Sequence, residues 1–117
     1  MVEVHLSLVV IRSGNLQESV RFYQMLGLNF EKHQHGNGLE HFASNLGQTT
    51  FEIYPQTAQG GTTTVTRLGF HVFDVDSLVI RLQKENISVI TKPSMSEWGR
   101  RAVVVDPDGH RIELIQY

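Results

Sequence analysis

Asp106-Pro107-Asp108-Gly109, followed by His110-Arg111-Ile112-Glu113-Leu114, is the stretch of sequence that says most about the fold. The first four residues favour a tight turn, and the alternation that follows is typical of a strand with one apolar face. A similar strand, Phe51-Glu52-Ile53-Tyr54, lies 61 residues earlier, behind the turn residues Asn45-Leu46-Gly47. The sequence therefore contains the same turn and strand twice.

The repeat extends back through a helix. At a spacing of 59 residues, Asn15 matches Asp74 as an N-cap, and Gly27 matches Asn86 as a residue suited to a left-handed C-terminal position. Between them, apolar residues recur at the i, i+4, i+7 spacing of one helix face. These residues are Leu16, Val20 and Tyr23 in the first copy and Val75, Val79 and Leu82 in the second. We therefore predict helices over 15–26 and 75–85, each packed on a sheet.

The two copies together predict an α+β fold made of two β-α-β-β-β modules. We expect module one to span 1–57 and module two 65–117, joined by the linker 58–64 within a single domain, 1–117. The predicted strands are 3–11, 29–34, 39–44 and 49–54 in the first module and 65–73, 87–91, 101–105 and 110–116 in the second.

Composition narrows the class of partner. The longest apolar runs are strand-sized, far short of the roughly 20 residues that cross a bilayer, and no export signal is evident, so a cytoplasmic location is the default. No cysteine is present, and the formal charge of −2 includes no basic run. These features argue against nucleic acid or membrane as partner and favour a small molecule.

Two segments carry a resemblance to a known family. Residues 16–28 place Phe22-Tyr23 before the helix exit Leu26-Gly27-Leu28, and residues 106–114 join an Asp-Pro-Asp-Gly turn to Ile-Glu-Leu. Both resemble signature segments of the glyoxalase/bleomycin-resistance/dioxygenase (vicinal oxygen chelate) superfamily. The resemblance implies one curved, incompletely closed sheet of eight strands, with the helices outside and a ligand pocket on the concave side.

The resemblance also implies positions for a metal. The superfamily's metal enzymes carry one ligand on the first strand and one on the last strand of each module. Glu52 and Glu113 match the last-strand positions, whereas Leu8 and Leu68 match the first-strand positions. A leucine has no lone pair, and two carboxylates with water make a weak site for Ni, Zn, Mn or Fe. We expect no metal; if one is present, Glu52 and Glu113 hold it.

Glu52 and Glu113 are the candidate catalytic residues. Alternation places each on the strand face opposite its apolar neighbours, so both point into the predicted pocket. Beside Leu8, Leu68 and Phe70, a partly desolvated carboxylate would suit proton transfer. Alternatively, both are solvated or form ion pairs with Arg12 and Arg111 on the same face. Both interpretations remain open.

Further candidate ligand-binding residues lie near the second module's edge. Alternation turns one of Arg100 and Arg101 inward, where it could hold a carboxylate or phosphate while Trp98 covers an apolar part of the ligand. Alternatively, Trp98 anchors an interface between modules or subunits. Tyr54 shares the face of Glu52 and is also a candidate.

The six histidines are assigned other roles. His5 and His71 stand an odd number of residues from Leu8 and Leu68, which places them on the opposite strand face, with His71 as a core residue. We expect surface positions for the three histidines around the glycine-rich turn 36–38, which are His33, His35 and His41. We expect His110, which directly follows the Asp-Pro-Asp-Gly turn, to fix that turn.

Two functions follow from this sequence. The first is a small-molecule-binding protein that sequesters a drug or senses a ligand without metal, as Leu8 and Leu68 favour. The second is a metal-dependent lyase or isomerase resembling lactoylglutathione lyase, with Glu52 and Glu113 as ligands or bases. We also expect a homodimer, because each module presents strand edges and an apolar face that one chain covers only in part.

Overall fold

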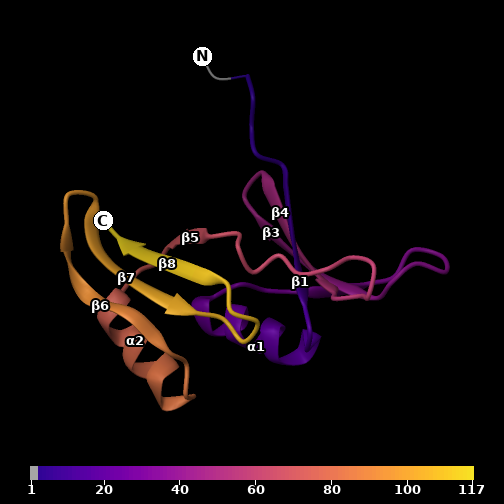
Figure 1. The fold of residues 1–117 in the computed structure, drawn as a ribbon. Coiled ribbons are helices and arrows are strands. Elements are labelled where there is room, and N and C mark those ends of the chain that lie inside the picture. Colours follow the sequence, from indigo (N-terminus) through magenta and orange to yellow (C-terminus); the bar gives the residue numbers. More distant parts are fainter. Residues whose placement is uncertain (1–2) are drawn as a thin grey trace. The chain divides into compact units, whose positions relative to one another are not determined.

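A computed structural model describes residues 3–117 of the chain. It divides into two compact units, Met1–Thr63 and Thr64–Tyr117, each with one helix and one four-stranded sheet (Figure 1). The boundary falls at the end of the predicted linker 58–64. The first two residues of predicted module one lie outside the described residues, and the single domain over 1–117 stays a prediction.

The first unit has the element order β-α-β-β-β. In the sheet the strand order is β1-β4-β3-β2, with β1 parallel to β4 and the other pairs antiparallel. Its elements are β1 (Leu8–Ser13), α1 (Leu16–Leu26), β2 (Glu31–His33), β3 (His41–Leu46) and β4 (Thr49–Pro55).

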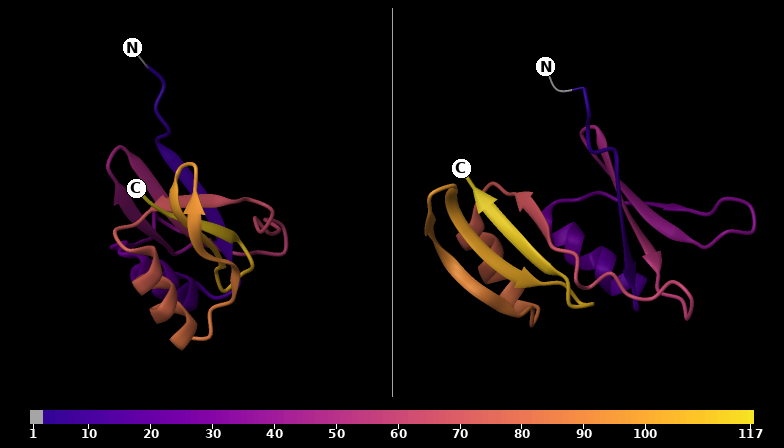
Figure 2. Two further views of the ribbon diagram at one scale, coloured as in Figure 1. Left: turned by 90° about the vertical axis from the view of Figure 1, so that its left-hand side faces the viewer. Right: turned by 45° about the horizontal axis from the view of Figure 1, so that its top comes forward.

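The second unit repeats this topology, with the strand order β5-β8-β7-β6 and a parallel pair between β5 and β8. Figure 2 shows α2 running along one face of this sheet. The elements are β5 (Leu68–His71), α2 (Val75–Lys84), β6 (Val89–Ser96), β7 (Gly99–Val105) and β8 (Arg111–Gln116). The prediction of an α+β fold with two β-α-β-β-β modules is confirmed.

Helix capping follows the sequence. The Asn15 side chain accepts a hydrogen bond from the Glu18 backbone N–H at 3.2 Å, and the Asp74 side chain accepts one from the Ser77 backbone N–H at 3.1 Å. At the other ends, Gly27 has φ 113° and Asn86 has φ 63°, both left-handed. Each cap satisfies backbone groups that the helix leaves unpaired.

Each helix covers one face of its own sheet. In the first unit, Tyr23 on α1 meets Phe51 on β4 edge to face, with ring centroids 5.0 Å apart. In the second, Leu82 on α2 is fully buried, as are Ile112 and Leu114 on β8. We call the opposite face of each sheet, which no helix of its own unit covers, the open face.

Three strand predictions were wrong in their bounds by more than two residues, and one of them is the fifth strand, which was expected over 65–73 but spans only Leu68–His71 as β5. The first strand was expected over 3–11, but β1 begins at Leu8, because its partner β4 begins only at Thr49. The sixth was expected over 87–91, but β6 continues to Ser96 opposite β7. The pairing of β6 shifts register around Pro93, which has no N–H to donate. A strand that is paired irregularly shows little alternation of apolar and polar residues in its sequence.

Among residues 3–117, no helix is both long and apolar enough to cross a membrane.

Candidate functional site

Glu52 lies on the open face of the first sheet. Its neighbours along β4, Phe51 and Ile53, are buried on the helix side, whereas the Glu52 side chain is 17% exposed. The register places Glu52 between Val10 on β1 and Ala43 on β3. The predicted orientation of this carboxylate is therefore confirmed, although its role is untested.

A hollow of about 370 Å³ adjoins Glu52 on the first unit. Its wall contains two carboxylates and one imidazole, together with amide, hydroxyl and apolar groups. This lining suits a ligand that brings hydrogen-bond donors or a positive charge. The lining residues are Asn29, Phe30, Glu31, His33, Ala43, Asn45, Thr50 and Glu52.

A row of polar rings crosses the same sheet beside Glu52. His33 pairs with His41 between β2 and β3, and His41 stacks on Tyr54 with ring centroids 4.1 Å apart and an interplanar angle of 7°. Arg12 on β1 pairs with Tyr54, and its guanidinium carbon lies 5.2 Å from the Tyr54 ring centroid. This is cation–π geometry. The predicted site residues Arg12 and Tyr54 thus lie together with Glu52.

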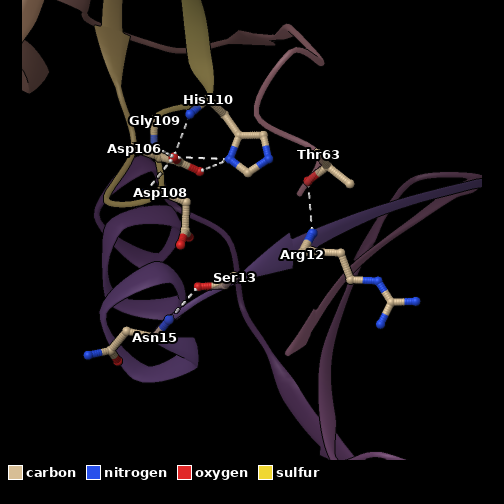
Figure 3. A network of polar contacts seen from close by, with 8 residues as sticks. All are labelled: Arg12, Ser13, Asn15, Thr63, Asp106, Asp108, Gly109 and His110. Atoms are coloured by element: carbon tan, nitrogen blue, oxygen red, sulfur yellow. Dashed lines mark hydrogen bonds and ion pairs between the residues drawn. The ribbon is translucent and has the colours of Figure 1, made fainter. Parts of the chain in front are cut away.

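Arg12 is not the partner of Glu52. The Arg12 Nη1 donates to the Pro55 carbonyl at 3.3 Å, and its backbone N–H donates to Thr63 Oγ1 at 2.9 Å (Figure 3). Within the described residues, the ion-pair contact of Glu52 is with His41, at 3.4 Å between Oε2 and Nε2. The suggested ion pair with Arg12 is therefore wrong.

Glu113 lies on the open face of the second sheet and forms an ion pair with Arg101 on β7. The two side chains are 35% and 26% exposed, respectively. Arg111 shares this face by the register of β8 but is exposed. The predicted face of Glu113 is confirmed, but its observed partner is Arg101 instead of Arg111.

The side chain of Arg100 lies on the face of β7 opposite to that of Arg101. Its guanidinium binds Asp76 at the start of α2 through two hydrogen bonds, Nε to Oδ2 at 2.7 Å and Nη2 to Oδ1 at 2.9 Å. These bonds lower the pKa of the Asp76 carboxyl and raise the pKa of Arg100. Of the two adjacent arginines, Arg101 is the one on the Glu113 face, so the placement of Arg100 at the ligand site is corrected.

The predicted face of Leu68 and Phe70 is also wrong. Leu68 pairs with Ile112 and Phe70 pairs with Leu114, which are buried on the helix side. Gly69 is the residue opposite Glu113, and a Cβ on Gly69 would lie 3.4 Å from Glu113 Oε2.

The error comes from the matching of the two first strands. Leu8 stands seven residues before its helix cap, whereas Leu68 stands six residues before its cap. The two leucines therefore fall on opposite strand faces. His71, expected in the core, is exposed, and its ring lies 4.2 Å from that of Tyr117.

Leu8 and Trp98 are both exposed within the structure. Leu8 pairs with Thr50 on the open face of the first sheet, as predicted. Trp98 forms the β6–β7 turn, where its backbone N–H donates to Ser96 Oγ at 3.2 Å and its side chain is 63% exposed. Neither the ligand-binding nor the interface interpretation of Trp98 is tested.

The histidines divide into three groups. His110 is fully buried and its Nδ1 lies 2.9 Å from Asp106 Oδ2, which confirms that it fixes the turn (Figure 3). His5 is exposed and precedes β1. His41 contradicts the expectation of a surface residue, because it is only 1% exposed. The signal in the sequence was the position of His33 and His41 on either side of the glycine-rich turn 36–38, which lets the two histidines meet across a hairpin.

Comparison with known proteins places this fold in a family. The sequence profile of the Glyoxalase/Bleomycin resistance protein/Dioxygenase superfamily matches residues 5–114. The chain belongs to this superfamily. The search of curated proteins found no matching sequence relative.

Solved structures of the superfamily's fold resemble the chain over nearly its whole length. The antibiotic-binding protein TnmS3 of Streptomyces sp. CB03234 is 25% identical, with a TM-score of 0.78, 99% of this chain covered and 98% of that one. Protein SA1046 of S. aureus is 20% identical, with a TM-score of 0.77 and coverage of 100% and 95%. The trypanothione-dependent glyoxalase I of Leishmania major is 24% identical, with a TM-score of 0.76 and coverage of 97% and 87%.

The residues at the superfamily's metal positions do not fit a metal. Leu8 has no lone pair, and Gly69, which lies opposite Glu113 on the open face of the second sheet, has no side chain that could bind a metal. Glu113 already accepts from a guanidinium, with which a metal ion would have to compete. A divalent transition metal prefers three or four nitrogen, oxygen or sulfur ligands at fixed geometry. Within residues 3–117, the superfamily's metal positions themselves supply only the two carboxylates of Glu52 and Glu113.

Proposed function

We propose that the chain binds a small organic molecule on the open face of its first sheet, without a metal held by Glu52 and Glu113. The observation that carries this proposal is the hollow of about 370 Å³ beside Glu52. The antibiotic-binding protein TnmS3, at 25% identity, supports a role in sequestering or sensing a ligand.

The ligand class follows from the wall of the hollow. Glu31 and Glu52 bring two carboxylates that a protonated amine, or several N–H and O–H donors, would satisfy. Leu8 and Val10, exposed on the neighbouring strand, offer apolar contact, and Tyr54 offers an aromatic ring. We therefore propose a partly apolar ligand with a basic or donor-rich group.

The second unit has a different character. Arg101 forms an ion pair with Glu113, so this carboxylate already has a partner. The exposed Trp98 lies near Arg101 at the start of β7, whereas Arg111 lies on the same open face at the other end of β7. We propose that these residues contact an acidic or aromatic part of a ligand and do not transfer protons.

Glu52→Gln tests the proposed site. A panel of basic and neutral small molecules is screened by thermal shift, and the affinity of any hit is measured by calorimetry. We expect Glu52→Gln to weaken binding at least tenfold, because the amide cannot form a charge-assisted hydrogen bond. Glu18→Gln, which removes the same charge from the exposed surface of α1, is the control and should bind as the wild type does. Equal affinity in all three proteins would refute the assignment.

The metal-dependent lyase or isomerase has less support, because its ligand positions do not fit a metal. We expect no glyoxalase activity on the adduct of glutathione and methylglyoxal. We also expect that Glu52→Gln and Glu113→Gln leave the metal content of the purified protein unchanged by elemental analysis. A transition metal that is lost from both variants would establish the enzyme hypothesis instead.

A further inference from the structure

Three histidines of the first unit converge at the β2–β3 hairpin. His33 ends β2, His41 begins β3, and His35 lies in the connection between them. Their ring centroids are 5.5–5.9 Å apart, and one nitrogen of each ring lies within 4.8 Å of one nitrogen of each of the others. We call these three residues the hairpin cluster. It shares no residue with the positions where the superfamily's enzymes hold their metal.

His41 has the hydrogen bonding of a prepared metal ligand. Its Nδ1 lies 3.0 Å from the Leu39 carbonyl oxygen, which can only accept, so Nδ1 carries a proton. In the neutral ring, Nε2 then holds the lone pair. Metal-binding histidines are typically oriented in this way, by donation of the other ring N–H to a carbonyl or carboxylate.

The Nε2 atom of His41 is buried without a hydrogen-bond partner among the described residues. The Glu52 Oε2 atom lies 3.4 Å away, but the contact does not have hydrogen-bond geometry. A buried nitrogen that lacks a hydrogen-bond partner destabilises the folded protein, and a cation bound to it would remove this destabilisation. This observation is independent of the clustering of the three rings and points to the same conclusion.

His33 has a similar outer partner. Its Nε2 lies 3.3 Å from Glu31 Oε2. Donation of this N–H to the carboxylate leaves Nδ1 of the neutral ring with the lone pair. Two of the three histidines therefore have an acceptor that selects one nitrogen for a ligand.

The cluster needs only a small adjustment to hold an ion. At metal–nitrogen bonds of about 2.1 Å in a tetrahedral site, ligand nitrogens lie about 3.4 Å apart. The ring nitrogens that now lie within 4.8 Å of one another would therefore have to close by at most about 1.4 Å. His33 and His35 are partly or fully exposed and can supply this by rotation of their side chains. Three imidazoles with an open fourth position suit Zn²⁺, Ni²⁺ or Cu²⁺.

We propose that His33, His35 and His41 form a binding site for a divalent transition metal at the β2–β3 hairpin. His33 also lines the hollow beside Glu52, so a bound ion would present its open position next to the proposed ligand site. The metal site does not depend on the proposed ligand binding, and each can fail without the other.

Calorimetric titration with Zn²⁺ or Ni²⁺ tests the site on protein purified without a histidine tag and stripped with chelator. We expect one ion per chain with a dissociation constant in the low micromolar range or tighter, and a rise in melting temperature. His33→Gln/His35→Gln should weaken binding at least tenfold. Both histidines are at least partly exposed, so this variant should fold.

The matched control is His5→Gln/His71→Gln, which removes two exposed histidines elsewhere and should bind as the wild type does. Absorption spectra with Cu²⁺ give a second measurement, since nitrogen ligation shifts the d–d band, and this shift should disappear in His33→Gln/His35→Gln alone. Equal weakening in both double variants, or binding that survives His33→Gln/His35→Gln and is lost in Glu113→Gln, would overturn the proposal.

Discussion

Asp106 organises the turn before β8 through a single carboxylate oxygen. Oδ1 accepts hydrogen bonds from the backbone N–H groups of Asp108, Gly109 and His110 at 2.9–3.0 Å, and the carboxylate also contacts the His110 ring (Figure 3). Both side chains are buried. We predict that Asp106→Ala lowers the free energy of unfolding by about 3 kcal/mol, because the buried backbone N–H and ring of His110 and the part-buried N–H of Asp108 lose this acceptor.

Urea unfolding measures this effect. Asp106→Asn is the control, because its amide oxygen can still accept from the backbone, and it should lose clearly less stability than Asp106→Ala. If the alanine variant unfolds within about 0.5 kcal/mol of the wild type, the turn does not depend on this side chain.

Glu113 illustrates a charge that can be removed without loss of the fold. Glu113 and Arg101 are both partly solvated, and ion pairs of this kind contribute about 1 kcal/mol or less. We predict that Glu113→Gln changes the free energy of unfolding by less than about 1 kcal/mol but alters ligand affinity in the second unit. If the variant unfolds while its residual folded fraction retains full affinity, the role assigned to Glu113 is wrong.

At the scale of one element, the N-terminus of α2 depends on two carboxylates. Asp74 caps the helix and Asp76 binds Arg100. Hydrogen bonds hold the pKa of both below the ordinary value of 3.8, from Ser77 for Asp74 and from Arg100 for Asp76. Since the folded-state pKa is lowered, the stabilisation is present above pH 3.8 and is lost as the pH falls through the folded-state pKa.

We predict that Asp76→Asn melts at a lower temperature than the wild type at pH 7 and that this difference narrows below pH 3.8. Thermal denaturation monitored by circular dichroism at pH 7 and pH 3 measures it. Arg100→Gln should lose the same pH-dependent stabilisation. The double variant Asp76→Asn/Arg100→Gln should melt at the same temperature as Asp76→Asn alone. A difference that widens on acidification would contradict the assignment.

The β6–β7 hairpin depends on a glycine. Gly99 has φ 125°, and a Cβ there would lie 2.4 Å from the Gln116 carbonyl oxygen on β8. We predict that Gly99→Ala destabilises the protein by about 2 kcal/mol or more, because neither the backbone nor the neighbouring strand accommodates the methyl group. Urea unfolding measures the loss. Gly69→Ala, whose Cβ would meet its nearest atom at 3.4 Å, should stay within about 0.5 kcal/mol of the wild type.

In the molecule as a whole, several large apolar side chains among residues 3–117 are exposed. Phe73 is 95% exposed. Other large exposed apolar residues are Val4, Leu6, Leu8, Val65, Trp98 and Tyr117. Exposed apolar surface of this kind commonly marks contacts between proteins.

We predict a homodimer at micromolar concentration, with twice the mass of the 13.3 kDa chain by light scattering. Phe73→Ser, at an exposed position before α2, should shift the equilibrium toward monomer if this surface takes part, whereas Ile80→Ser on the exposed side of α2 is the control. A monomeric mass for the wild type would count against the prediction.

Features that depend on near neighbours in the chain could be predicted from the amino-acid pattern. The repeat, both helices with their caps, and the faces of Glu52 and Glu113 all follow from capping chemistry and from the alternation of a single strand. These interactions span at most a few residues, so a linear pattern records them.

Which side chains meet across strands could be seen only in the folded chain. The pairing of Glu113 with Arg101, the turn of Leu68 away from Glu113 and the burial of His41 against Tyr54 depend on register between strands that are distant in sequence. A shift of one residue moves a side chain to the other face of a strand. The number of residues from the helix cap back to the matched leucine differs by one between the two modules. Register is set by the backbone pairing of whole strands, which no single segment of sequence specifies.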